Sequence, residues 1–496
     1  MKMPCIDFKT IITISNLYPR PDQPTRGVFN AQLFREMAAE SRRQRAKSRE
    51  QSGDVPRQQF DNSSTDTCFL NICLVPEWRL WRWPSIQRWT APGQLSSCPV
   101  AKLLSEKPAE QSITTQQLSN TTTNLPSTHY LPVFYLPIIG RNLNWWFYYR
   151  ALRRWYSRSF TAAIHHPTVF LASWLYPDAV AVARLAKDMG TPVWLRVHGT
   201  DRYHLRNIWR GRLIRNAVEY ANGVICNASA VAEDLAKWGL PTEKIHVVPN
   251  GVDSSLFRYR NKWGVLISQG AESPGKANRS GRGLNSPTTE QLRNNHIILF
   301  VGNLVPIKGP DIMLKAFAAL VDKQLHGYQV DALSSESSKI GSVSTTKRPI
   351  NRSAILLVIG SGPMMEKLVK MSRELGTADR VHFLGNRPHE EVALWMNMAD
   401  VLCLTSHSEG MPNVVVEALS SGLPVVATEV GACRELLNDE PVAKLCREAD
   451  VVGIRNALRW AVEQEVNRES LALRQQGRYS WTKQAGTILG LMGLGK

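Results

Sequence analysis

The chain has 496 residues, 43% hydrophobic content and a formal net charge of +18 at pH 7. This length and apolar content predict a globular protein of two or three domains. The sequence contains no apolar run long enough to span a membrane, and its first ten residues lack the apolar segment of a signal peptide, so we expect a cytoplasmic protein.

The excess of positive charge indicates an anionic partner, such as nucleic acid, anionic lipid or a nucleotide-bearing substrate. Charge alone does not choose among these partners. No nucleic acid is expected, because the sequence contains no zinc-finger or RNA-recognition motif. The 8 cysteines show neither CxxC pairs nor the density of a disulfide framework, so we expect most of them to be buried thiols.

The first predicted element is a buried strand over residues 10–15, followed by a turn-rich segment and a helix over 28–39. Gly27 lies in the turn, where its bare backbone would either form an ordinary turn or let a ligand approach closely. Residues 41–67 and 101–128 are polar or charged with little periodicity. Both segments are predicted to be insertions or long surface loops.

The segment 145–160 interleaves aromatic residues with arginines, which are Arg150, Arg153, Arg154 and Arg158. This pattern predicts a basic helix with bulky apolar side chains, which could lie on an anionic membrane surface. Alternatively, the aromatic residues pack into the core while the arginines stay solvated. The sequence leaves both interpretations open.

Strands and helices alternate regularly from residue 168 onwards. Predicted strands over 169–173 and 192–197 flank a helix over 178–189, which is the pattern of an α/β domain. The second strand runs into a His-Gly-Thr-Asp turn. Because open parallel sheets bind ligands at the carboxyl ends of their strands, we expect His198 and Asp201 in this turn to be functional.

Two further segments have the composition of connections. Residues 258–295 and 330–352 are rich in small, polar and basic residues, so they are predicted to be a linker and an insert. A second series of alternating strands and helices starts near residue 297. We therefore expect one domain over 1–255 and another over 256–478.

The stretch 401–428 predicts a strand, a polar loop, a helix and a second strand. Glu409 in the loop and Glu417 in the helix would lie within about 80° of each other around the helix axis, so both can face one crevice. The backbone N–H groups of 410–414 would lie at the positive end of the helix dipole. That position suits an anion such as a phosphate.

A lysine precedes another predicted helix in the second half. Gly302 and Asn303 follow a strand and Lys308 lies before the helix, so the lysine could meet phosphate oxygens. Alternatively, it is a solvated lysine in a polar loop. The Gly-Ser-Gly turn at 360–362 by itself indicates a tight strand-to-helix turn rather than a nucleotide fingerprint.

With these residues assembled, the chain resembles the retaining glycosyltransferases of family 4, which have the two-domain GT-B fold. The resemblance rests on Glu409-x7-Glu417 within SEGMPNVVVEALSSGLPVVAT, on FVGNLVPIKG, VIGSGP, HFLGN and PNGVD, and on RVHGTD with TISNLYPRPDQPTRGVF. It covers most of the chain apart from the inserts. It implies an α/β protein of two Rossmann-like domains facing a central cleft, with residues 479–496 as the helix that crosses back to the first domain.

The resemblance also implies a nucleotide-sugar donor held mainly by the second domain. Glu417 would bind the ribose hydroxyls, and Glu409 with the following amides would bind the transferred sugar. Lys308 would bind the diphosphate, and His198 would contact the sugar or the diphosphate near the reacting carbon. The other implied donor contacts are Gly302, Asn303, Asn386, Arg387, Gly410, Met411, Pro412, Asn413 and Val414. On the acceptor side the resemblance points to Gly27 and Asp201.

The sequence departs from the family pattern at Asn303, where many members carry an arginine that pairs with the diphosphate. An amide donates hydrogen bonds but supplies no charge. Stabilisation of the leaving group would then rest on Lys308 and the helix dipole, or on another arginine. Some members also have asparagine here, so we interpret Asn303 as a trait of a subgroup.

The residue types suggest how a sugar could be transferred. A lysine and helix-end amides can stabilise a leaving diphosphate without a metal ion, so no metal and no cofactor are expected. Retention could use a carboxylate nucleophile, but the resemblance instead implies same-face attack assisted by the leaving phosphate.

The leading hypothesis is a hexosyltransferase that acts on a hydroxyl group of a glycan or lipid-linked acceptor. Its role would be in cell-envelope or extracellular polysaccharide or glycolipid synthesis, and it could be peripheral at the inner face of the cell membrane. The alternatives are a non-catalytic or membrane-scaffold protein of the same fold and a nucleotide-sugar epimerase.

Overall fold

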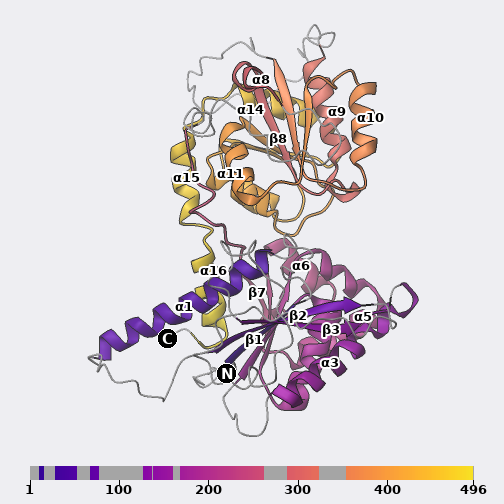
Figure 1. The fold of residues 1–496 in the computed structure, drawn as a ribbon, viewed down its shortest axis with the longest axis vertical. Coiled ribbons are helices and arrows are strands. Elements are labelled where there is room, and N and C mark those ends of the chain that lie inside the picture. Colours follow the sequence, from indigo (N-terminus) through magenta and orange to yellow (C-terminus); the bar gives the residue numbers. More distant parts are fainter. Residues whose placement is uncertain are drawn as a thin grey trace, which may run out of the picture. The chain divides into compact units, whose positions relative to one another are not determined.

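The computed structural model describes residues 10–15, 28–52, 68–77, 127–136, 138–159, 168–261, 287–322 and 353–494. The chain divides into two compact units (Figure 1). The first unit comprises residues 1–251 and 481–496, and the second unit comprises residues 252–480. Gly27 and the insert expected at 330–352 lie outside the described residues.

The described part of the first unit forms a seven-stranded parallel sheet in the order β3-β2-β1-β4-β5-β6-β7. Its strands are β1 (Thr10–Ser15), β2 (Cys68–Glu77), β3 (Ser127–Phe134), β4 (Thr168–Ser173), β5 (Val193–Val197), β6 (Gly223–Cys226) and β7 (Ile245–Val247). The strands predicted near the start of the chain and after residue 168 are confirmed. The order reverses between β1 and β4, which makes this pair the topological switch point of the sheet.

Helices pack around this sheet. They are α1 (Val28–Ser52), α3 (Asn144–Ser159), α4 (Val180–Met189), α5 (Ile208–Tyr220), α6 (Ser229–Lys237) and α16 (Trp481–Leu491). Short helical turns are η2 (Ile138–Leu143), η3 (Leu175–Ala179), η4 (Thr200–Arg206) and η5 (Thr242–Lys244). The last helix, α16, lies beside α1, and its Trp481 and Ile488 share a buried apolar cluster with Phe34 and Met37 (Figure 1).

Helix α1 corrects one expectation from the sequence. It begins at Val28 as predicted but continues to Ser52, so residues 41–52 belong to a helix and not to the loop expected over 41–67. The segment contains arginine, glutamine, lysine, glutamate and alanine, all good helix formers, and no glycine or proline before Gly53. Arg43 also forms ion pairs with Glu36 and Glu40 on the preceding turns.

The described part of the second unit forms a six-stranded parallel sheet in the order β10-β9-β8-β11-β12-β13. Its strands are β8 (His296–Val301), β9 (Ala354–Ile359), β10 (Val381–Gly385), β11 (Val401–Leu404), β12 (Val425–Thr428) and β13 (Ala443–Cys446). The strand, helix, strand pattern predicted over 401–428 is confirmed. The order reverses between β8 and β11, so these neighbours form the switch point of the second sheet.

The helices of the second unit connect these strands. They are α8 (Thr289–Asn294), α9 (Pro310–Val321), α10 (Met365–Glu374), α11 (His389–Met398), α12 (Asn413–Ser420), α13 (Cys433–Leu437), α14 (Val451–Glu463) and α15 (Arg468–Gln476), with the turn η6 (Pro306–Lys308). Helix α8 corrects the linker expected over 258–295. A reciprocal capping box between Thr288 and Gln291 starts a helix inside its last residues.

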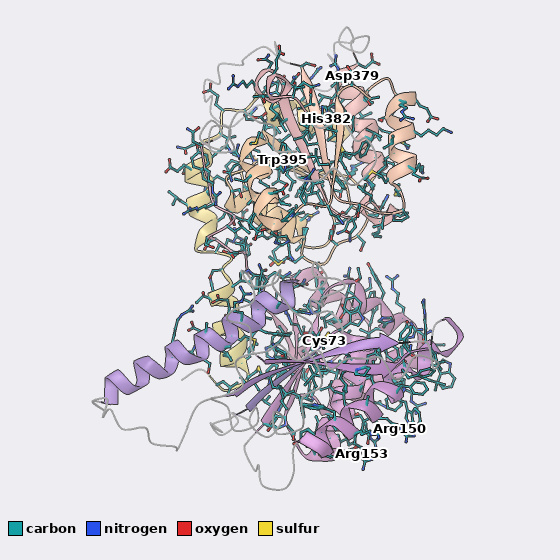
Figure 2. All side chains as sticks on the ribbon, viewed as in Figure 1. Cys73, Arg150, Arg153, Asp379, His382 and Trp395 are labelled. Atoms are coloured by element: carbon teal, nitrogen blue, oxygen red, sulfur yellow. The ribbon has the colours of Figure 1, made fainter. Side chains whose placement is uncertain are left out.

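Each unit has its own apolar core. In the second unit, Ile298, Phe300, Phe317 and Val358 are all buried, and Trp395 of α11, labelled in Figure 2, is buried as well. The cysteines whose side chains are described are buried free thiols, as expected. Among the described residues, no helix combines the length and the apolar character needed to cross a membrane.

Candidate active site

The loops that follow β8 and β11 form the candidate site in the second unit. Because these strands are parallel neighbours, their loops leave the same edge of the sheet side by side. The Thr405 hydroxyl donates a hydrogen bond to the Gly309 carbonyl at 2.7 Å, and the His407 amide donates to the Ile307 carbonyl at 2.8 Å. The two loops are therefore held together by one side-chain and one backbone hydrogen bond.

Gly309 makes the close approach of these loops possible. Its φ is 57°, in the left-handed region that glycine adopts without strain. A side chain at this position would also collide with the carbonyl of Thr405. The residue after Lys308 must therefore be a glycine if the lysine loop is to lie against the β11 loop.

Lys308 and Glu409 meet across the two loops. The Lys308 Nζ atom lies 2.6 Å from Glu409 Oε1, and the Ser406 hydroxyl donates to the same oxygen at 2.7 Å. The Glu409 side chain is 8% exposed, whereas the Lys308 side chain is 29% exposed. The structure thus brings together two predicted site residues and leaves the cation the more accessible of the two.

The loop after β12 supports Glu409 from its other side. The Ala432 amide donates to the Gly410 carbonyl at 2.8 Å. Gly431 has a φ of 54°, and a side chain there would lie within about 2.6 Å of the Glu409 and Gly410 carbonyls. The loops after β8, β11 and β12 therefore meet around Glu409 and Gly410.

Helix α12 starts directly after Glu409 and its loop. Pro412 occupies the N-cap position and makes no side-chain cap, so the first turn depends on other groups. Gly410, Met411 and Pro412 are buried, whereas Asn413 and Val414 are only partly buried. The amides of the first turn point towards the positive end of the helix dipole, as the sequence predicted.

Glu417 lies further along α12 and is partly buried. Burial raises the pKa of the Glu417 carboxyl above its usual value, while the nearby His389 acts in the opposite direction. A carboxylate with a raised pKa and little solvent is a ready acceptor for hydroxyl groups, because such groups restore the hydrogen bonds it has lost.

The turns after β8, β9 and β10 lie along the same edge. The Gly302 amide donates to the Ile359 carbonyl at 3.0 Å, and the Gly360 amide donates to the Gly385 carbonyl at 2.9 Å. Asn303 and Asn386 are exposed in these turns. Arg387 is partly buried and lies 3.4 Å from Glu391. The predicted donor contacts of the second unit therefore occupy one edge of one sheet.

His198 and Asp201 lie at the carboxyl end of β5 in the first unit. Asp201 is fully buried, and its carboxylate accepts hydrogen bonds from the amides of His198 at 2.9 Å and Leu175 at 3.1 Å. Burial raises the pKa of Asp201 to about 6, against the effect of these amides. A carboxylate held in this way positions the His198 turn.

The His198 imidazole stacks against the Trp174 ring, with 6.3 Å between the ring centres. Burial lowers the pKa of His198 well below its usual value, and the positive charge of Arg196 adds to this effect. The imidazole is therefore neutral at physiological pH. A neutral imidazole can donate one hydrogen bond and accept another.

Sequence reasoning missed Arg196, which is 1% exposed in β5. Its Nη1 atom donates to the Asn30 Oδ1 atom at 3.2 Å, and the Asn30 Nδ2 atom donates to the Ser15 hydroxyl at 3.2 Å. These contacts join β5, α1 and β1 at the switch point of the first sheet. Burial lowers the pKa of Arg196 to about 9, with Asp201 acting in the opposite direction. An arginine within an otherwise apolar strand was the available signal.

Models of glycosyltransferase families match both halves of the chain. Residues 103–256 match the model described as Glycosyltransferase Family 4. Residues 289–478 match the model described as Glycosyl transferases group 1, and this range contains Lys308, Glu409 and Glu417. The two matched ranges lie on opposite sides of the boundary between the units at residue 251.

Curated relatives include D-inositol 3-phosphate glycosyltransferases. The protein from Thermomonospora curvata is 32% identical over 226 residues, which cover 44% of each chain. The protein from Acidothermus cellulolyticus is 27% identical over 285 residues, covering 56% of this chain and 54% of the relative. The chain thus spans about half the length of the curated relatives it matches.

Solved structures of similar fold cover nearly the whole chain. Anabaena Alr3699/HepE, solved in complex with UDP and glucose, has a TM-score of 0.58 at 15% identity and covers 98% of this chain and 99% of its own. Sucrose-phosphate synthase from Thermosynechococcus elongatus has a TM-score of 0.61 at 17% identity and covers 98% of both chains. These similarities confirm the predicted GT-B class with two Rossmann-like domains.

Proposed function

Because glycosyltransferase models match both halves of this chain, we propose that it transfers a sugar from a nucleotide-sugar donor to a hydroxyl acceptor with retention of anomeric configuration. The proposed enzyme is a hexosyltransferase. The observation that carries the proposal is the contact between Lys308 and Glu409 at the switch point of the second sheet.

Lys308 is suited to bind the donor diphosphate. Cleavage of the bond between the sugar and the diphosphate develops negative charge on the leaving phosphate. The lysine is the accessible member of its ion pair, so its Nζ atom can turn from Glu409 to a phosphate oxygen. The positive end of α12 provides a second source of stabilisation. We therefore propose that the reaction needs no metal ion.

Glu409 is proposed to bind the transferred sugar. Once Lys308 engages phosphate, one Glu409 oxygen becomes available to accept hydrogen bonds from sugar hydroxyls. The contacts of the Glu409 carboxylate with Lys308 and Ser406 hold it in a fixed position, which suits a group that binds the sugar. We therefore favour same-face attack, in which the acceptor hydroxyl passes its proton to the leaving phosphate, over attack by Glu409 as a nucleophile.

The nucleoside part of the donor has its own proposed contacts. Glu417 would accept hydrogen bonds from the ribose hydroxyls, since its carboxylate is short of solvent. Asn386 and Arg387 follow β10 on the same sheet edge and would lie near the base. In the first unit, His198 is proposed to contact the reacting sugar or the diphosphate as a neutral imidazole.

The names of the similar proteins suggest which substrates to test first. UDP and glucose are bound in the Anabaena structure, so UDP-glucose is a reasonable first donor. The curated relatives are named for D-inositol 3-phosphate, so a polyol phosphate is a reasonable first acceptor. More widely, we propose that the acceptor is a glycan or a lipid-linked molecule. The enzyme would then act in the synthesis of cell-envelope or extracellular polysaccharide or of glycolipid.

The test compares wild-type protein with Glu409→Gln and with the control Glu366→Gln, whose side chain is exposed on α10. A panel of nucleotide sugars is offered with polyol-phosphate and glycolipid acceptors, with and without a chelator, and nucleotide release and product are measured. We expect turnover by the wild type and the control, with or without chelator, and about 100-fold less or none by Glu409→Gln.

The outcomes separate the alternatives. NMR of the product reports whether the anomeric configuration is retained. Equal turnover by wild type and Glu409→Gln would contradict the proposed site. Conversion of the donor sugar without an acceptor would indicate an epimerase, and nucleotide binding without turnover would indicate a non-catalytic protein.

A further inference from the structure

Four large apolar side chains of the first unit are exposed near the start of α3 and the start of α5. They are Ile208, Trp209, Leu143 and Trp146, which are 82%, 69%, 57% and 40% exposed. We call these four residues the Trp209 face. Exposure of this much apolar surface on neighbouring elements is typical of an interaction site rather than of an ordinary surface.

The two parts of the Trp209 face are joined by polar contacts. The Arg210 Nε atom donates to the Asn142 side-chain oxygen at 2.8 Å, which ties the first turn of α5 to the turn before α3. The Tyr176 hydroxyl donates to the Arg141 carbonyl at 2.7 Å, and the Arg210 guanidinium lies over the Tyr176 ring. Trp209 and Leu143 are the sequence neighbours of this hydrogen-bonded pair, so the start of α5 lies close to the turn before α3.

A side-chain cap fixes the backbone at the start of α5, which carries Ile208 and Trp209. The Asn207 side chain accepts a hydrogen bond from the Arg210 amide at 3.0 Å and caps α5. Ile208 and Trp209 therefore project from the first turn of a capped helix. Such residues are presented in a fixed orientation, with little conformational entropy to lose when they become buried.

Basic residues surround the face. The exposed arginines on these elements are Arg141, Arg150, Arg153, Arg154, Arg206, Arg212 and Arg215. The Arg150 guanidinium lies 4.8 Å from the centre of the Trp146 ring, and Arg150 and Arg153 are labelled at the outer edge of the first unit (Figure 2). The combination is an apolar centre with a positively charged rim.

Few acidic side chains offset this charge. Within residues 138–159 and 200–220 of the described chain, the acidic residues are Asp201, which is fully buried, and Glu219, which is exposed near the end of α5. On the neighbouring α4, Asp188 forms an ion pair with Arg184 and accepts a hydrogen bond from Tyr149. The face therefore presents positive charge to whatever binds it.

Helix α3 has one side packed into the first unit and one side facing solvent. Tyr148 and Leu152 are buried, with exposed fractions of 1% and 0%, so one side of the helix packs into the unit. Trp146 and the arginines lie on the other side. This is the division expected of an amphipathic helix whose polar side carries both charge and an interfacial aromatic residue.

We propose that the Trp209 face docks this protein on an anionic lipid bilayer. Aliphatic and indole side chains enter the boundary between headgroups and acyl chains, while arginines pair with lipid phosphates. The aliphatic Ile208 and Leu143 favour lipid over a single-stranded nucleic acid, because bases stack on aromatic rings rather than on aliphatic chains. This inference goes beyond sugar transfer and does not depend on it, since binding needs no donor.

The experiment measures binding of the full chain to vesicles in the absence of nucleotide. One set contains phosphatidylcholine alone, and the other contains phosphatidylcholine with phosphatidylglycerol. We expect binding to the anionic set that weakens as salt is raised. The variant Ile208→Ser with Trp209→Ser should bind at least about tenfold more weakly. The variant Arg150→Gln with Arg153→Gln should bind about 25-fold more weakly and respond less to salt.

The matched control is Val452→Ser with Leu473→Ser in the second unit, where the native side chains are 59% and 64% exposed. This control should bind vesicles as the wild type does. Thermal melts check that each variant is folded. Substitutions at exposed positions should leave the melting temperature unchanged.

Three results would overturn the proposal. The first is unchanged vesicle binding by Ile208→Ser with Trp209→Ser. The second is wild-type protein that ignores anionic vesicles but binds a single-stranded oligonucleotide. The third is an absence of vesicle binding together with a dimer in sedimentation that the serine variant dissociates, because the face would then contact a second copy of this chain.

Discussion

The Lys308 Nζ atom lies 2.6 Å from the Glu409 Oε1 atom, although the two residues are 101 positions apart in the chain. The pair joins the loops that follow β8 and β11, which are neighbours only because of the strand order of the second sheet. Ser406 donates to the same carboxylate oxygen. In the proposed reaction, a diphosphate would compete with Glu409 for the lysine.

Replacement of this lysine tests its role in the chemistry. Lys308→Met should lower kcat by about 100- to 1000-fold, because the leaving phosphate loses its cation in a partly buried site. The measurement is the steady-state rate of nucleotide release from the donor that the panel identifies. Lys315→Met, on an exposed position of α9, is the control and should retain wild-type activity. A Lys308→Met protein as active as this control would show that Lys308 does not stabilise the leaving group.

Glu417→Gln should weaken nucleotide binding but not the folded state. Loss of a charged acceptor for the ribose hydroxyls should raise the Kd for the nucleotide by about ten- to 100-fold. Isothermal titration measures this effect, with Glu390→Gln, exposed on α11, as the control. Equal affinity of Glu417→Gln and wild type would contradict the ribose contact.

The same variant has a pH-dependent effect on stability. Burial raises the pKa of Glu417 in the folded protein, so the folded state binds the proton more tightly than the unfolded state. The contribution of Glu417 to the stability of the wild type therefore falls as the pH rises through the pKa that this carboxyl has in the folded protein. Glu417→Gln has no such loss, so its Tm relative to wild type should increase with pH, as measured by thermal melts of the ligand-free protein. A Tm difference independent of pH would contradict it.

Two partly buried histidines should make the first unit sensitive to acid. Burial lowers the pKa of His198 well below its usual value and that of His204 to about 4, where Arg210 and Arg141 add to the effect. The unfolded state then binds more protons than the folded state below about pH 6.5, so stability falls as the pH is lowered from there towards 4.

Urea unfolding at pH 7.5 and pH 5, both chosen around the histidine pKa of about 6.5, checks this sign. His204→Gln should lose less stability than wild type between the two conditions, because it has no imidazole to protonate. A loss equal to that of wild type would show that His204 does not contribute to the acid sensitivity.

Arg468 should be important for the stability of the second unit. Its guanidinium donates to the carbonyls of Met396, Asn397 and Ala399 at the end of α11 and to that of Gly422 after α12. Arg468→Met would leave these buried carbonyls without donors and should lower the free energy of unfolding by about 2–4 kcal/mol. Urea unfolding measures the change.

The control for this prediction is Arg474→Met on the same helix, whose native side chain is 52% exposed. It should change the free energy of unfolding by less than about 1 kcal/mol. Arg468→Lys should recover only part of the loss, since an ammonium cannot reach carbonyls on two elements at once. A similar effect of the 468 and 474 methionine variants would contradict the role given to Arg468.

Much of the second unit could be predicted from local patterns. Short apolar runs marked β8, β9, β10, β11 and β12, because a buried parallel strand needs apolar residues on both faces. The long helix over 28–52 was only half predicted, since its basic second half resembles the composition of a loop. Helix α8 was hidden for the same reason, at the edge of a polar segment.

Other site features depended on burial, which composition does not report. Asp201 has the residue type of a ligand-binding group, but its carboxylate is enclosed and holds two amides. Arg196 was passed over in an apolar strand, yet it connects β5 with α1. Ile208 and Trp209 sit among arginines in the sequence, and only the packing of α5 shows that they face solvent.

Local residue patterns were enough to predict the strand, loop and helix that carry Glu409 and Glu417, because the spacing of residues along one helix is a local property of the backbone. They were also enough to place Lys308 before a helix. The contact between Lys308 and Glu409, the burial of Asp201 and the exposure of Trp209 became visible in the folded protein. The reason is that these relationships depend on which strands pair and which faces pack, and those choices are made by contacts between residues far apart in the chain.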